Sequence, residues 1–124
     1  MRLLIAMMYP PILMRMLESD ELYTLQEKYK RYQELKNIKG PRSKEYLDTK
    51  SFMNDFVYSH PLLPKVQTAA LEIMNELCAF FLQSDGCTAD VISVDDIVVN
   101  GASDAVLKQA QENMLNKGFE LVAM

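Results

Sequence analysis

The stretch VQTAALEIMNELCAFF, residues 66–81, carries the strongest hydrophobic pattern in the chain. Its apolar residues recur at three- and four-residue spacing, which is the period of one helix face, and that face is broad enough to be buried. Pro61 and Pro64 stand at the head of the pattern, and Gly86 follows it where a left-handed cap would end a helix. The stretch therefore predicts a long central helix against which the rest of the chain packs.

Downstream of this helix, β-branched residues dominate two short runs, 91–94 and 97–99, which Asp95 and Asp96 divide. One interpretation is a strand with a bulge or turn at the two aspartates. The alternative is a strand over 91–94 and then a short helix over 94–100, capped by Ser93 and Asp96. We favour the strand, because β-branched residues occupy both sides of the aspartates.

The chain then predicts one more helix and one more strand. Ser103 is a suitable N-cap for an amphipathic helix, and Gly118 would end that helix. Residues 119–124 have the composition of a short strand. The C-terminal third is therefore a strand-helix-strand unit, which normally contributes both strands to one sheet.

The N-terminal half begins with an apolar run at residues 3–8, which Pro10 and Pro11 close and which predicts a buried strand. The densely apolar residues 12–17 predict a short helix that starts at these prolines.

Two longer helices are predicted next. The T-x-x-E motif of Thr24 and Glu27 is a capping box that would start the first, and Gly40-Pro41 would stop it. Its buried stripe would consist of Leu25, Tyr29, Tyr32, Leu35 and Ile38. Residues 43–58 predict the second, with a break near residues 48–49.

These segments predict an α+β fold that is mostly helical, with about five helices, a small sheet of about three strands and the C-terminal strand-helix-strand unit. The chain has 124 residues, of which 49% are hydrophobic and 24% charged, a composition typical of globular proteins. That length suits a single domain spanning residues 1–124.

The cysteines and the N-terminus bear on where the protein acts. Cys78 and Cys87 match neither a disulfide framework nor a metal-ligand spacing, which favours a reducing compartment. The apolar N-terminus superficially resembles a signal peptide, but prolines interrupt it and no small-x-small cleavage site follows. It is also shorter than the roughly 20 residues of a membrane-spanning helix. We expect a cytoplasmic protein without membrane contact.

A basic segment at residues 28–44 is the first candidate interaction surface. Its cations are Lys28, Lys30, Arg31, Lys36, Lys39, Arg42 and Lys44. Interleaved tyrosines give it the ingredients for binding nucleic acid, since cations neutralise phosphates and aromatic rings stack on bases. On a helix, however, Lys28, Arg31 and Lys39 share an arc of roughly 80° that excludes Lys30 and Lys36. A solvated helix and a surface for an acidic protein are therefore the competing interpretations.

The methionine-rich N-terminus is the second candidate surface. Met8, Tyr9, Ile12, Leu13 and Met16 form an adaptable apolar segment, which either belongs to the core or contacts another chain. We favour the core, and exposure of residues 12–17 would instead predict self-association or partner binding.

Residues suited to catalysis are few. His60 precedes Pro61 at a helix entrance, where histidine commonly serves in the turn, and Cys78 lies on an apolar helix face. Asp90, Asp95 and Asp96 could gather a magnesium ion, but aspartates in a turn are usually turn formers. Phosphate-binding glycine loops are absent from the sequence. We therefore expect no catalytic, cofactor or metal site.

By elimination, the sequence predicts a small non-enzymatic interaction protein, such as a regulator, inhibitor or adaptor, with a protein partner. The alternative is a nucleic-acid-binding protein that uses residues 28–44. Formation of a homo-oligomer is left open.

Overall fold

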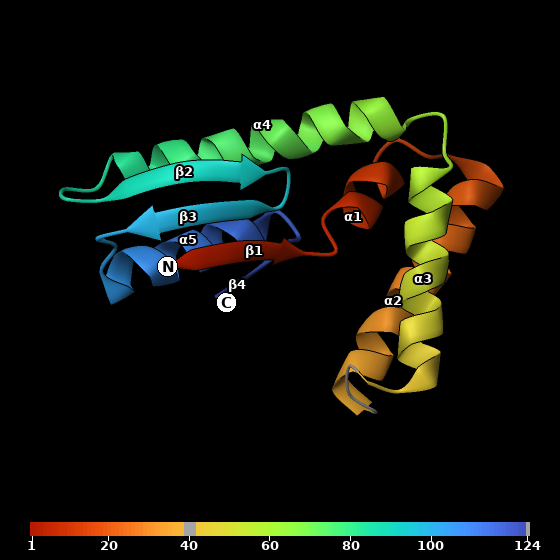
Figure 1. The fold of residues 1–124 in the computed structure, drawn as a ribbon. Coiled ribbons are helices and arrows are strands. Elements are labelled where there is room, and N and C mark those ends of the chain that lie inside the picture. The colour runs from red at the N-terminus through yellow and green to blue at the C-terminus, as the bar shows by residue number, and fades with distance from the viewer. Residues whose placement is uncertain (39–41, 124) are drawn as a thin grey trace.

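The computed structural model describes residues 1–38 and 42–123, and its ribbon is drawn in Figure 1. The elements in chain order are β1 (Arg2–Ala6), α1 (Tyr9–Met14), α2 (Ser19–Ile38), α3 (Lys44–Tyr58), α4 (Leu63–Leu82), β2 (Thr88–Ser93), β3 (Asp96–Asn100), α5 (Asp104–Asn116) and β4 (Glu120–Ala123). The predicted α+β class and the five helices are confirmed. The described residues form four strands where about three were predicted.

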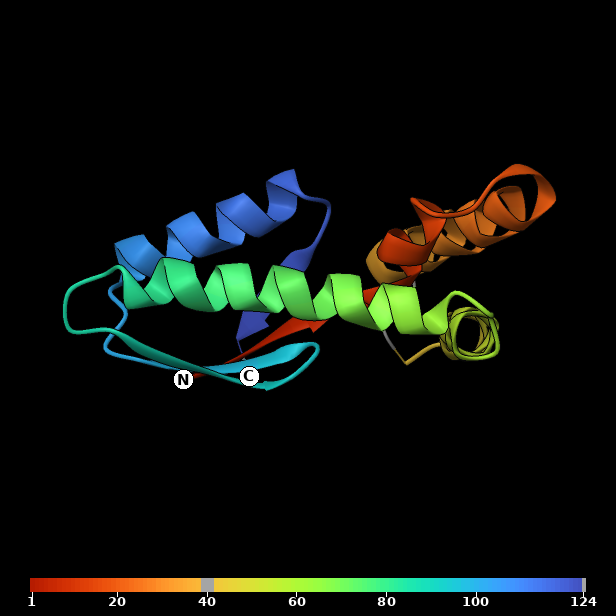
Figure 2. The ribbon, with the colours of Figure 1, turned by 90° about the horizontal axis from the view of Figure 1, so that it is seen from above.

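The four strands make one sheet in the order β2-β3-β1-β4, with every neighbouring pair antiparallel. Helices α4 and α5 lie on the same side of this sheet (Figure 2). Their buried contacts include Met74 and Phe81 of α4 and Met114 of α5, together with Leu3 and Ile97 of the central strands. The order β1-α4-β2-β3-α5-β4 is the split β-α-β connectivity called ferredoxin-like.

The C-terminal third confirms the strand-helix-strand prediction, since β3 and β4 belong to one sheet with β1 between them. Ser103 caps α5 by accepting a hydrogen bond from the Val106 amide at 3.2 Å. Gly118 follows the helix with a φ of +89°, a conformation that glycine adopts without strain.

The strand interpretation of residues 94–100 is also confirmed. The chain turns at Val94-Asp95, so the two β-branched runs lie in β2 and β3 of an antiparallel hairpin. An irregularity between Val91 and Ser93 leaves Ile92 without a partner in the ladder. The paired aspartates thus divide one predicted strand into two, which accounts for the additional strand.

Helices α1, α2 and α3 are inserted between β1 and α4. In Figure 1, α2 and α3 lie side by side as a helical hairpin that projects away from the end of the sheet. The two helices are in contact, and their buried residues include Leu25 and Leu35 of α2 and Met53 and Val57 of α3. Helix α1 contacts both hairpin helices and α4, so it joins the hairpin to the rest of the fold.

The predicted start of α2 is wrong. Helix α2 begins at Ser19, so Thr24 and Glu27 lie inside it and form no capping box. Asp20 and Glu21 occupy its first turn, where acidic side chains favour a helix start because of the helix dipole. Ile38, predicted to be buried, is 74% exposed. The predicted stop at Gly40-Pro41 lies outside the described residues.

Helix α3 is continuous through the predicted break at residues 48–49. The Thr49 side chain is buried, and its hydroxyl donates a hydrogen bond to the Glu45 carbonyl at 2.7 Å. That bond gives the hydroxyl a partner within the helix, so a polar residue here does not interrupt it. Ser43 caps the start by accepting from the Tyr46 amide at 3.2 Å.

Candidate binding cleft between the helical hairpin and the sheet

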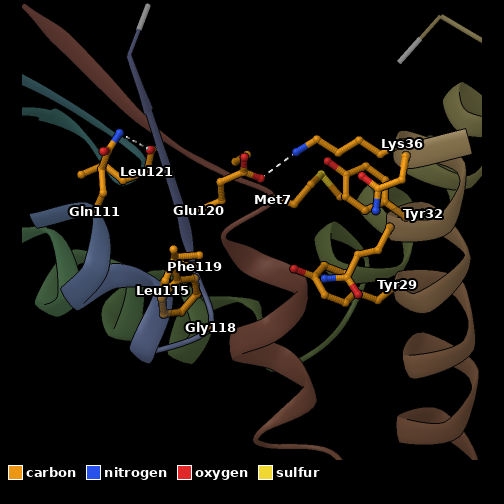
Figure 3. Close-up of a pocket in the computed structure, with 13 residues that line it drawn as sticks. Met7, Tyr29, Tyr32, Lys36, Gln111, Leu115, Gly118, Phe119, Glu120 and Leu121 are labelled. Atoms are coloured by element: carbon orange, nitrogen blue, oxygen red, sulfur yellow. Dashed lines mark hydrogen bonds and ion pairs between the residues drawn. The ribbon is translucent and has the colours of Figure 1, made fainter. Parts of the chain in front are cut away.

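A cleft separates α2 from the end of the sheet and the C-terminal end of α5, and Figure 3 shows it in close-up. We call it the Tyr29 cavity. Its volume is about 730 Å³, and its lining comprises Ala6, Met7, Tyr29, Tyr32, Gln33, Lys36, Asn37, Gln111, Leu115, Gly118, Phe119, Glu120 and Leu121. The volume falls within the range of ligand sites in proteins, roughly 300–1,000 Å³.

Aromatic side chains build the wall that α2 contributes. The rings of Tyr29 and Tyr32 stack with centroids 6.0 Å apart, and those of Tyr32 and Tyr46 stack at 5.1 Å. The hydroxyls of Tyr32 and Tyr46 are hydrogen-bonded at 3.3 Å and buried. Burial raises the pKa of Tyr29, and burial together with the Tyr46 hydrogen bond raises the pKa of Tyr32. Both phenols therefore stay protonated at neutral pH.

An ion pair crosses the Tyr29 cavity. The Lys36 ammonium lies 2.6 Å from the Glu120 carboxylate, as the dashed line in Figure 3 marks. The two side chains are 36% and 52% exposed, and a pair this accessible to solvent contributes at most about 1 kcal/mol to stability. The ion pair therefore connects α2 to β4 but adds little to the stability of the fold.

The opposite wall comes from α5 and the start of β4. Leu115 is 61% exposed and forms an apolar rim, whereas Phe119 is buried and belongs to the core. Arg15 lies over the Phe119 ring with its guanidinium carbon 5.2 Å from the centroid. The Gln111 amide donates to the Leu121 carbonyl at 3.3 Å, which satisfies a backbone acceptor of β4.

A second cavity, of about 540 Å³, lies against the neighbouring part of the hairpin. We call it the Lys50 cavity. It shares Ala6, Met7, Tyr32 and Lys36 with the Tyr29 cavity, so the two are adjacent parts of one cleft. Its remaining lining is Leu4, Ile5, Met8, Tyr9, Pro10, Tyr46, Lys50, Asn54, Tyr58, Ser93, Val94, Asp95 and Val122.

Three cations of the basic segment, Lys28, Arg31 and Lys44, line one further cavity of about 730 Å³, which the carboxylates of Glu45 and Asp48 also line. Lys28 lies over the Phe52 ring, with its nitrogen 4.7 Å from the centroid. Arg31 pairs with Glu34 at 3.3 Å and with Glu45 at 2.7 Å. Intramolecular partners therefore already occupy these two cations, just as Glu120 occupies Lys36.

Three other described cations of the segment lie outside the cleft. Lys30, Arg42 and Lys44 are exposed. Lys39 lies outside the described residues. Of the six predicted cations that the structure describes, only Lys36 lines the Tyr29 cavity or the Lys50 cavity.

The methionine-rich segment belongs to the core, as favoured. Met8, Ile12 and Leu13 are no more than 3% exposed, because α1 packs against α2, α3 and α4. The alternative prediction that these three residues form a hydrophobic contact surface is therefore wrong. Tyr9 is half-buried and lines the Lys50 cavity, and Met16 is 36% exposed.

His60 serves in the turn before α4. Its Nδ1 accepts a hydrogen bond from the Leu62 amide at 3.1 Å, and its Nε2 lies 2.6 Å from the Glu21 carboxylate. An Nδ1 that accepts carries no proton, so Nε2 is the donor to Glu21. Both ring nitrogens thus have structural partners.

The remaining candidates for chemistry are likewise engaged in the fold. The Cys78 thiol donates to the Ala89 carbonyl at 3.4 Å, and burial raises the pKa of Cys78, which disfavours the thiolate. The Asp96 carboxylate accepts from the Arg2 guanidinium, whose Nε lies 2.8 and 3.0 Å from its two oxygens. Over residues 1–38 and 42–123, no group of three potential metal ligands is assembled.

None of the helices in these residues combines the length and apolarity that crossing a bilayer requires.

Sequence reasoning missed most of the cleft. Gln33 and Asn37 on α2, and Asn54 and Tyr58 on α3, belong to no recognised motif. The signal that could have found the α3 residues is the four-residue spacing of Tyr46, Lys50, Asn54 and Tyr58, although the same spacing also describes an ordinary helix surface. No protein-family model, curated protein or solved structure matches this chain.

Proposed function

We propose that this protein is a non-enzymatic interaction protein that receives a segment of a protein partner in the Tyr29 cavity. The observation that carries the proposal is the composition of that cavity. Tyr29 and Met7 are half-buried and Leu115 is exposed, all around one concavity. Tyrosine and methionine are enriched where proteins bind each other, because they bury large areas and adapt to a partner.

The polar groups of the Tyr29 cavity support a binding role over a catalytic one. Lys36 and Glu120 pair with each other, and the raised pKa of the tyrosines leaves them poor acids or bases near neutral pH. The amides of Gln33 and Asn37 can donate to and accept from a peptide backbone. Because Cys78 and Cys87 are both free thiols, we propose the cytoplasm as the location.

Nucleic-acid binding through residues 28–44 has less support. Lys28, Arg31 and Lys36 already contact a ring or a carboxylate, and releasing them would add a cost to phosphate binding. Tyr32 is 5% exposed and cannot stack on a base without opening the hairpin.

Site-specific photo-crosslinking tests the proposal. A benzophenone side chain placed at Asn37, on the cleft rim, should crosslink to a protein in nuclease-treated lysate of the native cell. The same group at Ser51, an exposed position on α3 outside both cavities, should not form that adduct.

Matched substitutions complete the test. Leu115→Asp puts a charge on the apolar rim and should reduce the Asn37 adduct at least about tenfold, the effect of 1.4 kcal/mol. Leu82→Asp is the control, because Leu82 is similarly exposed, at 55%, and lies outside both cavities. Equal loss in both variants, or an adduct that disappears with nuclease, would contradict the proposal, and the second result would favour nucleic acid.

A further inference from the structure

One stripe of α3 faces the Lys50 cavity. Tyr46, Lys50, Asn54 and Tyr58 follow one another at four-residue intervals, and each step of four advances only about 40° around a helix. All four line the cavity. A lysine and an asparagine are thereby held between two aromatic side chains on one wall.

The Lys50 ammonium lacks an anion. The side chain is half-buried, and no carboxylate among the described residues forms an ion pair with it. Lys36, in contrast, has Glu120. A half-buried cation in a concave site attracts an anionic group more strongly than a cation on an open surface does, because less water screens the two charges from each other.

The lining of the same cavity also includes two tyrosine rings and a carboxylate. The rings of Tyr9 and Tyr58 are 5.8 Å apart and tilted by 58°. Asp95, in the turn between β2 and β3, also lines the cavity, and one of its oxygens accepts from the Ser93 hydroxyl at 2.9 Å. Tyr9, Tyr58 and Asp95 therefore line the same cavity.

Two aromatic rings beside a carboxylate suit an ammonium group. The ring faces attract a cation through their quadrupoles, and the carboxylate neutralises its charge. Apolar side chains of Met8, Pro10, Val94 and Val122 complete the lining and offer a surface to a hydrocarbon group. The cavity therefore presents one unpaired cation, one cation-binding corner and an apolar wall.

We propose that the Lys50 cavity binds a free α-amino acid with an aromatic or aliphatic side chain, which places its carboxylate on Lys50 and its ammonium against the Tyr9–Tyr58 pair and Asp95. An α-amino acid is the smallest common ligand that carries both charges and an apolar group. The cavity volume of about 540 Å³ accommodates one such molecule. This ligand site goes beyond the proposed protein-binding role, and its test is independent of any partner.

Three ligands that share a phenyl group separate the contributions of the two charges. Isothermal titration of the full chain with L-phenylalanine is compared with 3-phenylpropionate, which lacks the ammonium, and with 2-phenylethylamine, which lacks the carboxylate. L-Phenylalanine should bind at least about tenfold more tightly than either analogue, because each analogue leaves one charged group of the site unpaired. L-Leucine should bind in the same manner if the apolar wall accepts aliphatic side chains.

Two substitutions assign the charges to residues. Lys50→Gln should remove the preference for L-phenylalanine over the amine, and Asp95→Asn should remove the preference over the acid. Lys44→Gln and Asp90→Asn are the matched controls, since both residues are exposed and lie outside the Lys50 cavity. Circular dichroism checks that every variant is folded.

The inference is overturned by absence of binding at millimolar ligand, by equal affinity for all three ligands, or by a preference that Lys50→Gln and Asp95→Asn leave unchanged. Tight binding of the acid alone would likewise overturn it, because the Tyr9-Tyr58-Asp95 corner would then contribute nothing. None of these results bears on the Asn37 crosslink, so the two proposals can fail separately.

Discussion

The buried hydrogen bond between the Tyr32 and Tyr46 hydroxyls should couple α2 to α3 energetically. The bond is 3.3 Å long, and the two residues are 5% and 6% exposed. Removing one hydroxyl leaves the other without its partner, which typically costs about 1–3 kcal/mol, whereas removing both leaves no unpaired group. We expect Tyr32→Phe and Tyr46→Phe each to lower the free energy of unfolding by about 1–2 kcal/mol.

The double variant should cost at least about 0.5 kcal/mol less than the sum of the two single variants, because the penalty for an unpaired hydroxyl then disappears. Urea denaturation followed by circular dichroism measures this, provided that the slope of unfolding free energy against urea stays constant across variants. Tyr23→Phe is the control on the same helix, since Tyr23 is 63% exposed and should change stability by less than about 0.5 kcal/mol. Strictly additive effects, or single variants that match Tyr23→Phe, would refute the coupling.

Three further outcomes follow from the same contacts. Because the pKa of Tyr32 is raised, the folded chain retains a proton that the unfolded chain releases above about pH 10, so the free energy of unfolding should fall there by up to about 1.4 kcal/mol per pH unit. Chemical denaturation at pH 9 to 11 should show a shallower fall for Tyr32→Phe than for the unsubstituted chain. An unchanged slope in the variant would contradict this prediction. Lys36→Gln should lower stability by less than about 1 kcal/mol at low salt and by less still at 1 M salt, because the Lys36–Glu120 pair is exposed; a larger, salt-independent loss in urea titrations would show that the bridge is not a surface pair. Ser103→Ala should cost about 1 kcal/mol by removing the α5 cap, with Ser51→Ala, at an exposed site inside α3, as the neutral control in the same assay.

The elements could be predicted from the sequence wherever a local rule sets the structure. The apolar period of residues 66–81 predicts α4, and Ser103 with Gly118 delimits α5 because a cap and a left-handed glycine act within a few residues. The capping-box prediction at Thr24 and Glu27 is wrong because it rested on a local motif alone. A local motif cannot register that Asp20 and Glu21, further upstream, already provide a favourable helix start.

The sequence could not predict the cleft, because its walls come from distant parts of the chain. Lys36 and Glu120 are separated by 84 positions and meet only once α2 projects beside β4. The basic segment also looked more cationic than it is, since Arg31 pairs with Glu45 and Lys36 with Glu120, two carboxylates that lie outside residues 28–44. A charge count along the chain has no means of registering such pairs.

The position of the helical insertion explains why both proposed sites lie in one cleft. In the split β-α-β connectivity, a strand passes directly into the helix that packs on its sheet, but here α1, α2 and α3 intervene between β1 and α4. The chain therefore leaves the end of β1 and must return to α4, which holds the hairpin next to the end of the sheet (Figure 1). Residues 6–9 at that exit line the cleft, with Met7 in both cavities. The other walls belong to the insertion on one side and to the sheet and α5 on the other, so a change in the orientation of the hairpin should alter both cavities together.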